Sequence, residues 1–212
     1  MPKVPREEIG AFVAAMPIVY PLERLLRGCS SVLDVGCGDR SPLRFVRTAA
    51  RKTGFDGYQP SIDLARRRGI HDDYVCAEME RLGDIDRRFD AVMALEVLEH
   101  LPKERGVPFL QTLERLAKKI VIISTPNGFL PTPTEEDNPY QQHLSGWEPH
   151  ELRALGYTVL GSAGIKPLRG EAGRIAKRPA PLWWIASKLS EPLVYSRPEK
   201  AFGLIAYKRV NR

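Results

Sequence analysis

The 212-residue sequence predicts an α/β fold in which a mostly parallel sheet is covered by helices on both faces. Three observations predict it. Short apolar runs recur along the chain, segments with apolar residues at helical spacing separate them, and glycine or proline marks the boundaries. Such runs suit strands that are buried on both faces, as helices on both sides of a sheet require.

The first predicted strand, over 32–35, leads into a turn with two glycines, Gly36 and Gly38. Glycine accepts positive φ and has no Cβ, so a bound molecule can approach the backbone of this turn closely. Ser41 and Pro42 have the residue types of a helix N-cap and a first helical position. The helix predicted there has these apolar residues on one face: Leu43, Val46 and Ala50.

The alternation continues from Gly54, which is expected to end that helix. The further predicted strands are 55–58, 73–77, 89–95, 120–124, 157–161 and 202–207. Three further helices are predicted. The first begins at Ser61, and the third spans 149–155. The second is built on these apolar residues: Phe109, Leu110, Leu113 and Leu116. We expect one domain over 1–212, with a helical N-terminal segment (1–28), a polar, proline-rich lid loop (126–147) and a helical insertion (162–200).

Composition and charge limit the classes of function. The net charge of +6 permits attraction to nucleic acid or anionic lipid, but the arginines at 66–68 precede Gly69 and suit a solvated helix end. Cys29, Cys37 and Cys76 lack metal-ligand spacing, and their odd number argues against a disulfide framework. We therefore expect a cytoplasmic protein without a metal site, and the sequence has no apolar run of membrane-spanning length.

The spacing of the first turn separates two kinds of nucleotide cofactor. A dinucleotide fingerprint needs a third glycine where Ser41 stands, which disfavours a dehydrogenase. The stretch Asp34-Val35-Gly36-Cys37-Gly38 has the form D-x-G-x-G and resembles motif I of the class I S-adenosylmethionine-dependent methyltransferases. The resemblance implies S-adenosyl-L-methionine as the cofactor, with Asp34, Gly36, Cys37 and Gly38 around its amino-acid part.

Ligands of open parallel sheets bind at the carboxyl ends of the strands, so the ends of later strands are expected to complete the site. After the second strand, Gln59 is expected to bond the ribose, and Asp56 is the alternative. After the third strand, Glu78 and Met79 fall on the positions at which the family binds adenine.

The segment Leu95-Glu96-Val97-Leu98-Glu99-His100-Leu101 closely resembles the one that follows strand four in small-molecule methyltransferases of types 11 and 23. Segments 123–129 and 143–147 resemble the region after strand five of the same family. The resemblance implies a Rossmann-like, doubly wound, seven-stranded sheet with strand order 3-2-1-4-5-7-6 and strand 7 antiparallel. It also makes Leu95 a cofactor contact.

Methyl transfer needs a general base only if the acceptor must lose a proton. Glu96 is a candidate base or pocket residue, and an acid placed at a helix N-terminus is the alternative. His100 is expected on the same helical face as Glu96, and His143 in the lid loop. Both are catalytic candidates, with packing and loop anchoring as the alternatives.

The insertion joins Trp183 and Trp184 to an apolar helical stripe. We expect it to cover the edge of the sheet with both tryptophans in the core. The alternative is a hydrophobic acceptor pocket, or a shallow membrane contact that collects a lipidic acceptor. The basic residues around it are Arg169, Arg174, Lys177, Arg178 and Lys188.

The sequence therefore predicts an S-adenosylmethionine-dependent methyltransferase whose acceptor is a small molecule, hydrophobic and lipidic ones included, methylated at oxygen or nitrogen. Two alternatives stay open. A nucleic-acid methyltransferase is suggested by the basic charge, but the N-P-P-Y and Pro-Cys motifs are missing, so nucleic acid is not the expected partner. A non-catalytic cofactor-binding scaffold is suggested by Gln59.

Overall fold

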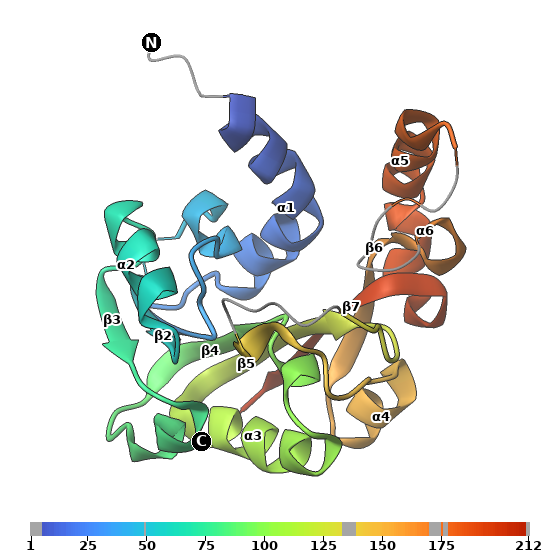
Figure 1. Ribbon diagram of the computed structural model, residues 1–212. Coiled ribbons are helices and arrows are strands. Elements are labelled where there is room, and N and C mark those ends of the chain that lie inside the picture. Colours follow the sequence, from blue (N-terminus) through green and yellow to red (C-terminus); the bar gives the residue numbers. More distant parts are fainter. Residues whose placement is uncertain (1–5, 49, 133–138, 170–174, 176–177, 211–212) are drawn as a thin grey trace.

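One seven-stranded sheet runs through the protein, with the strand order β3-β2-β1-β4-β5-β7-β6 (Figure 1). The computed structural model describes residues 6–48, 50–132, 139–169, 175 and 178–210. The strands are β1 (Ser31–Val35), β2 (Arg51–Asp56), β3 (Asp73–Cys76), β4 (Phe89–Leu95), β5 (Ala117–Pro126), β6 (Thr158–Ile165) and β7 (Ala201–Arg209). Strand β7 is antiparallel to β5 and β6, and the other pairs are parallel. The predicted fold class and strand order are therefore confirmed.

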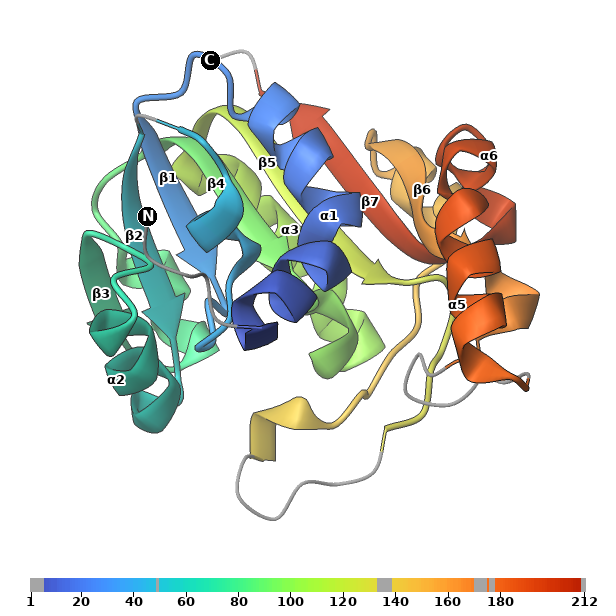
Figure 2. The same cartoon turned by 90° about the horizontal axis from the view of Figure 1, so that it is seen from above.

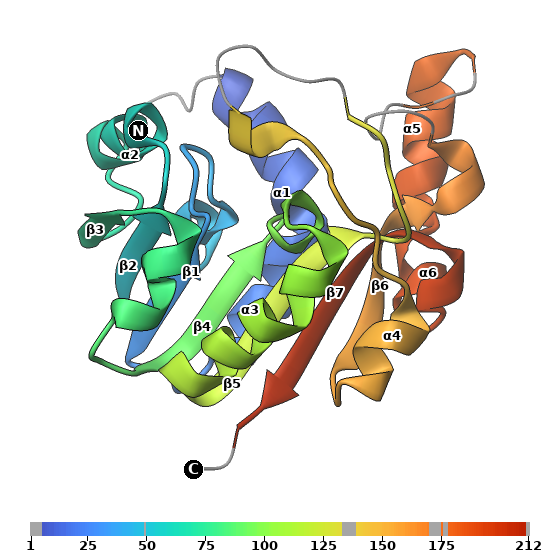
Figure 3. The same cartoon turned by 60° about the horizontal axis from the view of Figure 1, so that its bottom comes forward.

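Helices cover both faces of this sheet. The helices are α1 (Arg6–Leu25), α2 (Gln59–Arg67), α3 (Lys103–Leu116), α4 (Pro149–Ala154), α5 (Ala180–Leu189) and α6 (Glu191–Tyr195). Helices α3 and α4 lie on one face, where Phe109, Leu113 and Leu152 pack against the sheet (Figure 3). Helix α1 lies on the opposite face, where Leu22 and Leu26 belong to a second core cluster (Figure 2). Among the described residues, no helix combines the length and apolarity needed to cross a membrane.

The region after the first glycine turn differs from the prediction of a regular helix. Only a short 3-10 helix, η1 (Pro42–Phe45), forms there, and Ser41 caps it by accepting a hydrogen bond from the Leu43 N–H at 3.3 Å. Leu43 and Val46 are nevertheless buried, because α1 packs against this segment and supplies the apolar partners. The predicted burial is thus confirmed, while the predicted length of the helix is wrong.

Strand β2 begins and ends earlier than predicted. Gly54 lies inside this strand, paired with Asp34 of β1 and Tyr74 of β3, and does not end a helix. A Cβ at Gly54 would lie 2.8 Å from the Cys37 sulfur, so the glycine is needed for close packing. The strand consequently ends at Asp56, and Gln59 is the first residue of α2.

The insertion forms α5 and α6 beside the edge strand β6, as the contacts between these elements show. Its tryptophans are not both in the core as expected, because Trp184 is 41% exposed and Trp183 is half-buried. Leu189 and Leu193 are also exposed on these helices. Parts of three predicted segments lie outside the described residues: 1–5 of the N-terminal segment, 133–138 of the lid loop, and 170–174 and 176–177 of the insertion, with Arg174 and Lys177.

Candidate functional site

The two-glycine turn stands at the carboxyl end of β1, at the centre of the sheet. Gly36 and Gly38 have φ of 65° and 53°, which side chains other than glycine rarely allow. A Cβ at Gly36 would lie 2.5 Å from Cγ2 of Val97, whereas one at Gly38 would enter open space. The N–H groups of Gly36 and Cys37 donate to the Phe55 carbonyl of the next strand at 2.7 and 3.1 Å. The turn is therefore fixed by β2 and open on the side of Gly38.

Asp34 lies behind this turn. Its carboxylate is 2% exposed, accepts a hydrogen bond from the Ser41 hydroxyl at 2.5 Å, and lies 2.8 Å from Nε2 of His71. These contacts tie the start of η1 and the loop before β3 to β1. The structure thus gives Asp34 neighbours within the protein that fix the turn, and its expected contact with the cofactor stays a prediction.

Asp56 is the carboxylate that reaches the turn from β2. Its oxygens accept hydrogen bonds from the N–H groups of Gly38 and Tyr58, both at 2.8 Å. Burial raises the pKa of Asp56, and these two hydrogen bonds oppose the shift. Gln59, the favoured ribose ligand, instead donates its side-chain amide to Asp63 at 2.8 Å on the exposed surface of α2. The sequence analysis placed the end of β2 too late, which is why Gln59 was preferred.

Glu78 and Met79 stand at the start of the 3-10 helix η2 (Met79–Asp84), after β3. The Tyr140 hydroxyl, from η4 (Pro139–Gln141), donates to both carboxylate oxygens of Glu78 at 2.7 and 2.9 Å. Met79 is partly buried against the core below α3. Tyr140 was missed from the sequence, since 62 positions separate it from Glu78.

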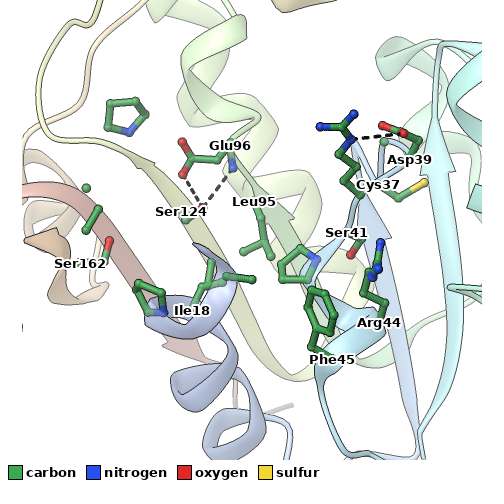
Figure 4. Close-up of a pocket in the computed structure, with 18 of the residues that line it drawn as sticks. Ile18, Cys37, Asp39, Ser41, Arg44, Phe45, Leu95, Glu96, Ser124 and Ser162 are labelled. Atoms are coloured by element: carbon green, nitrogen blue, oxygen red, sulfur yellow. Dashed lines mark hydrogen bonds and ion pairs between the residues drawn. The ribbon is translucent and has the colours of Figure 1, made fainter. Parts of the chain in front are cut away.

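A cavity of about 1450 Å³ opens beside the turn. Its wall includes Cys37 and Gly38 from the turn, Leu95 and Glu96 at the end of β4, and Ser124 on β5 (Figure 4). The Cys37 thiol faces a protein interior that raises its pKa, first through burial and then through the charge of Asp34. The lining also includes apolar residues from α1 and β7 and several basic residues: Ala15, Pro17, Ile18, Phe202, Arg40, Arg44, Lys52 and Arg68.

Glu96 occupies the inner part of this cavity with an unusual backbone. Its φ is 54°, and such a conformation in a residue other than glycine has an energetic cost. Ser124 fixes it: the Glu96 N–H donates to the Ser124 carbonyl and hydroxyl at 3.0 and 3.1 Å, and Oε1 accepts from that hydroxyl at 2.7 Å (Figure 4). The residue is exposed towards the cavity, yet protein atoms crowd around its carboxyl group, and this desolvation raises the pKa of Glu96.

His100 and His143 lie together next to Glu99. Their ring centroids are 4.8 Å apart in an edge-to-face arrangement. His100 ends a three-residue 3-10 helix, η3 (Leu98–His100), so the predicted helical face shared with Glu96 does not exist. Burial lowers the pKa of His100, and burial followed by the charge of Glu96 raises that of Glu99. The structure brings all three predicted catalytic side chains, Glu96, His100 and His143, to one region.

The described residues fit S-adenosylmethionine. A backbone turn without side chains faces the cavity at Gly38, and the Asp56 carboxylate adjoins it. The Glu78 carboxylate follows at the end of the next strand, and a Cβ at Gly57 would lie 3.6 Å from its oxygen. The turn suits the amino-acid part of the cofactor. The Asp56 carboxylate can accept hydrogen bonds from the ribose hydroxyls, and the Glu78 carboxylate can accept one from the adenine amino group.

Comparisons with known proteins agree with this arrangement. A family model described as a methyltransferase domain matches residues 33–125. The ubiquinone biosynthesis O-methyltransferase of Chromobacterium violaceum is 31% identical over 170 residues, which cover 65% of this chain and 69% of that protein. The mitochondrial ubiquinone biosynthesis O-methyltransferase of Arabidopsis thaliana is 31% identical over 105 residues, 45% of this chain and 29% of that protein. The chain spans less than half of this relative and of two others, at 43% and 42%.

Solved structures share the fold. A SAM dependent methyltransferase from Archaeoglobus fulgidus has a TM-score of 0.58 and 18% identity, and the match covers 91% of this chain and 93% of that chain. The plantazolicin methyltransferase BpumL in complex with SAH has a TM-score of 0.60 and 17% identity, with 97% and 87% covered. With its glycine turn, its sheet order and these sequence relatives, the chain belongs to the class I S-adenosylmethionine-dependent methyltransferase family.

Proposed function

We propose that the protein transfers a methyl group from S-adenosylmethionine to an oxygen of a small organic acceptor. The proposal rests on one observation: the open glycine turn, at Gly38, and Glu96 line the same cavity. The name of the relatives, ubiquinone biosynthesis O-methyltransferase, supports oxygen over nitrogen. The apolar residues of the cavity, among them Ile18 and Phe202, support an acceptor with an apolar body.

Three groups of this chain would hold the cofactor. The backbone of 36–38 would hold its amino-acid part, Asp56 its ribose, and Glu78 with Met79 its adenine. When bound, the cofactor supplies an activated methyl group on a positively charged sulfur. The protein then has to orient the acceptor and exclude water, and such positioning accounts for several kcal/mol of barrier reduction.

Glu96 would act at the acceptor. It lines the cavity, and the Ser124 hydroxyl holds Oε1 by a hydrogen bond of 2.7 Å. In the reaction, the acceptor O–H gives its proton to Glu96, a new O–C bond forms to the methyl group, and the C–S bond breaks with its electron pair left on sulfur. Proton acceptance by a positioned carboxylate contributes on the order of a hundredfold or more in rate.

Calorimetry tests the cofactor site. We expect the protein to bind S-adenosylmethionine and its demethylated product, S-adenosylhomocysteine, and not NAD. Asp56→Asn should weaken binding of the product about tenfold or more, since hydrogen bonds to a charged partner are worth about 1.5–3 kcal/mol. Asp63→Asn, on the exposed face of α2, is the matched control. Failure of the wild type to bind either sulfur compound at millimolar concentration would overturn the proposal.

A methyl-transfer screen tests the acceptor. Labelled S-adenosylmethionine is supplied with hydroxylated aromatic compounds, lipid extracts or nucleic acid. We expect label in hydroxylated apolar molecules, and label only in nucleic acid would contradict the proposed acceptor class. The Glu96→Gln variant should lose turnover while it still binds the demethylated product.

A reducing cytoplasmic setting is part of the proposal. All three cysteines, Cys29, Cys37 and Cys76, are free thiols, which supports such a compartment. Cys37 is one of them and lines the cavity, so oxidation of its thiol would alter the cavity wall.

A further inference from the structure

A cluster of three possible metal ligands lies next to the cavity, outside the groups used above to hold the cofactor. Glu99, His100 and His143 each offer one ligand atom, and these atoms all lie within 4.8 Å of one another. Two of the residues come from η3, and the third comes from the segment that leads towards α4, 43 positions later. The backbone holds these two segments together, because the N–H groups of Leu144 and Ser145 donate to the Glu99 carbonyl at 2.8 and 3.0 Å.

Glu99 is the residue that requires an explanation. It is 1% exposed, and within the described part of the chain no hydrogen bond of full geometry reaches its carboxylate oxygens, although Thr125 and the Glu96 carboxyl group lie close to them. A buried carboxylate without a cationic partner is strongly unfavourable, because burial removes its hydration, and the nearby charge of Glu96 adds repulsion. A cation between Glu99 and the two imidazoles supplies the missing partner.

The two histidines present the nitrogen that a metal ion requires. Nδ1 of His100 lies 3.0 Å from the Gln142 carbonyl, and Nδ1 of His143 lies 2.6 Å from the Leu130 carbonyl. A carbonyl oxygen only accepts hydrogen bonds, so Nδ1 carries the proton in both rings. The lone pair of each neutral ring is then on Nε2. Metal-ligating histidines show this arrangement, in which the second nitrogen donates to a backbone carbonyl.

We propose that Glu99, His100 and His143 bind one divalent transition-metal ion, such as Mn²⁺, Co²⁺ or Zn²⁺. Two imidazole nitrogens with a carboxylate favour these ions over Mg²⁺ and Ca²⁺, which prefer oxygen ligands. Three protein ligands leave coordination positions open, as in catalytic metal sites. Glu96 lines the cavity and interacts with Glu99, so it connects the cluster to the space proposed for the acceptor.

The role of the ion rests on the proposed function, whereas its binding does not. An ion at this place coordinates the acceptor hydroxyl and favours loss of its proton, as metal ions do for bound water. The proton passes to Glu96, the oxygen attacks the methyl carbon, and the C–S electron pair remains on the sulfur of the departing S-adenosylhomocysteine. No oxidation or reduction takes place, so the ion acts only as a Lewis acid.

Metal binding is tested on the chelator-treated full chain by calorimetry and by electron paramagnetic resonance of Mn²⁺. We expect one Mn²⁺ per chain, and at least tenfold weaker binding in Glu99→Gln and in His143→Asn. His150→Asn is the matched control, because His150 is exposed and pairs with Glu148 on the surface, away from the cluster's three residues. Wild-type protein that binds no Mn²⁺, Co²⁺ or Zn²⁺, or ligand variants that bind like the control, would overturn the proposal.

Two further measurements make the result easier to interpret. One shows whether a variant has misfolded, and the other shows whether the proposed function fails while the metal site is intact. Binding of S-adenosylhomocysteine reports on the fold of each variant, and His100→Gln, at a half-exposed position, serves if a variant at buried Glu99 does not fold. If Mn²⁺ binds as expected but no acceptor is methylated, the metal site stands and the proposed function fails. If the chelated enzyme methylates its acceptor at the full rate, the proposed role of the ion fails.

Discussion

Gly36 shows at the scale of one residue how the backbone of the turn depends on its sequence. It combines a φ of 65° with a Cβ position only 2.5 Å from Val97. Gly69 has a similar φ of 61°, but a Cβ there would meet nothing within 4 Å. The pair separates the cost of the backbone conformation from the cost of a steric clash.

Alanine substitutions at these two glycines test that separation. We expect Gly69→Ala to cost about 1–2 kcal/mol of unfolding free energy from the positive φ alone. Gly36→Ala should cost about 1–3 kcal/mol more, because Val97 has to move. Only Gly36→Ala should weaken S-adenosylhomocysteine binding. Urea denaturation and calorimetry measure both quantities, and equal effects of the two variants would contradict the role given to Val97.

Asp90 links residue-scale electrostatics to stability. It accepts hydrogen bonds from Lys119 at 2.8 Å and from the N–H and hydroxyl of Ser30, both at 2.9 Å. The hydrogen bond from Lys119, followed by that from the Ser30 N–H, lowers the pKa of Asp90 to about 2. A carboxyl whose pKa is lower in the folded state stabilises the protein above its unfolded pKa of about 4, and loses that effect as the pH falls through the folded value.

The Asp90→Asn variant should therefore be less stable than the wild type at pH 7, by on the order of 1–3 kcal/mol. The difference should shrink between about pH 4 and pH 2, as the wild-type carboxyl becomes protonated. Urea unfolding at pH 7, 4 and 3 measures it. Asp84→Asn is the control, because Asp84 is exposed and pairs only with Arg81 over 3.4 Å. A stability difference that does not change with pH would contradict the assignment to the charge of Asp90.

At the scale of the element, the sequence predicted buried runs better than their ends. β4 is found at the predicted residues, because its continuous apolar run has charged or turn-forming residues at both ends. β2 was misplaced, because Gly54 has the residue type of a helix end, and only its packing against Cys37 and His71 explains a glycine inside a strand. Asp56 was passed over for Gln59 as a consequence. Residue type alone does not show which groups a neighbouring strand brings into contact.

The short helix η4 limits access to Glu78. Tyr140 donates to both oxygens of the carboxylate expected to receive the adenine amino group. We expect Tyr140→Phe to bind S-adenosylhomocysteine about three to ten times more tightly, because a hydrogen bond to a charged group no longer has to be broken. Calorimetry measures the change, with Tyr195→Phe on α6 as the control. Weaker binding by Tyr140→Phe would show that the hydroxyl helps to hold the cofactor.

At the scale of the whole molecule, the carboxyl ends of the parallel strands gather the site. The turn after β1, Asp56 at the end of β2, Glu78 after β3 and Glu96 after β4 come from separate parts of the chain. Alternating apolar segments predicted such a sheet, but its order came from the family resemblance, since strand pairing depends on contacts distant in sequence. The ligand geometry around Glu99 was not predictable, because it requires two segments 43 positions apart and a view of unsatisfied buried atoms.

The segment 139–147 carries Tyr140 at one end and His143 nearby, so we expect events at the two places to be energetically linked. If the cofactor displaces Tyr140 from Glu78, the movement should also pull on His143, and an ion that fixes His143 should oppose it. Thermodynamic linkage then requires each ligand to weaken the other by the same factor, about fivefold for a coupling of about 1 kcal/mol. Titrating Mn²⁺ with and without S-adenosylhomocysteine, and the reverse, measures this factor. It should fall towards one in Tyr140→Phe, and a factor of one in the wild type would show that the two ligands bind independently. Such antagonism would make the metal ion an aid to product release, the step that returns the enzyme to its next turnover.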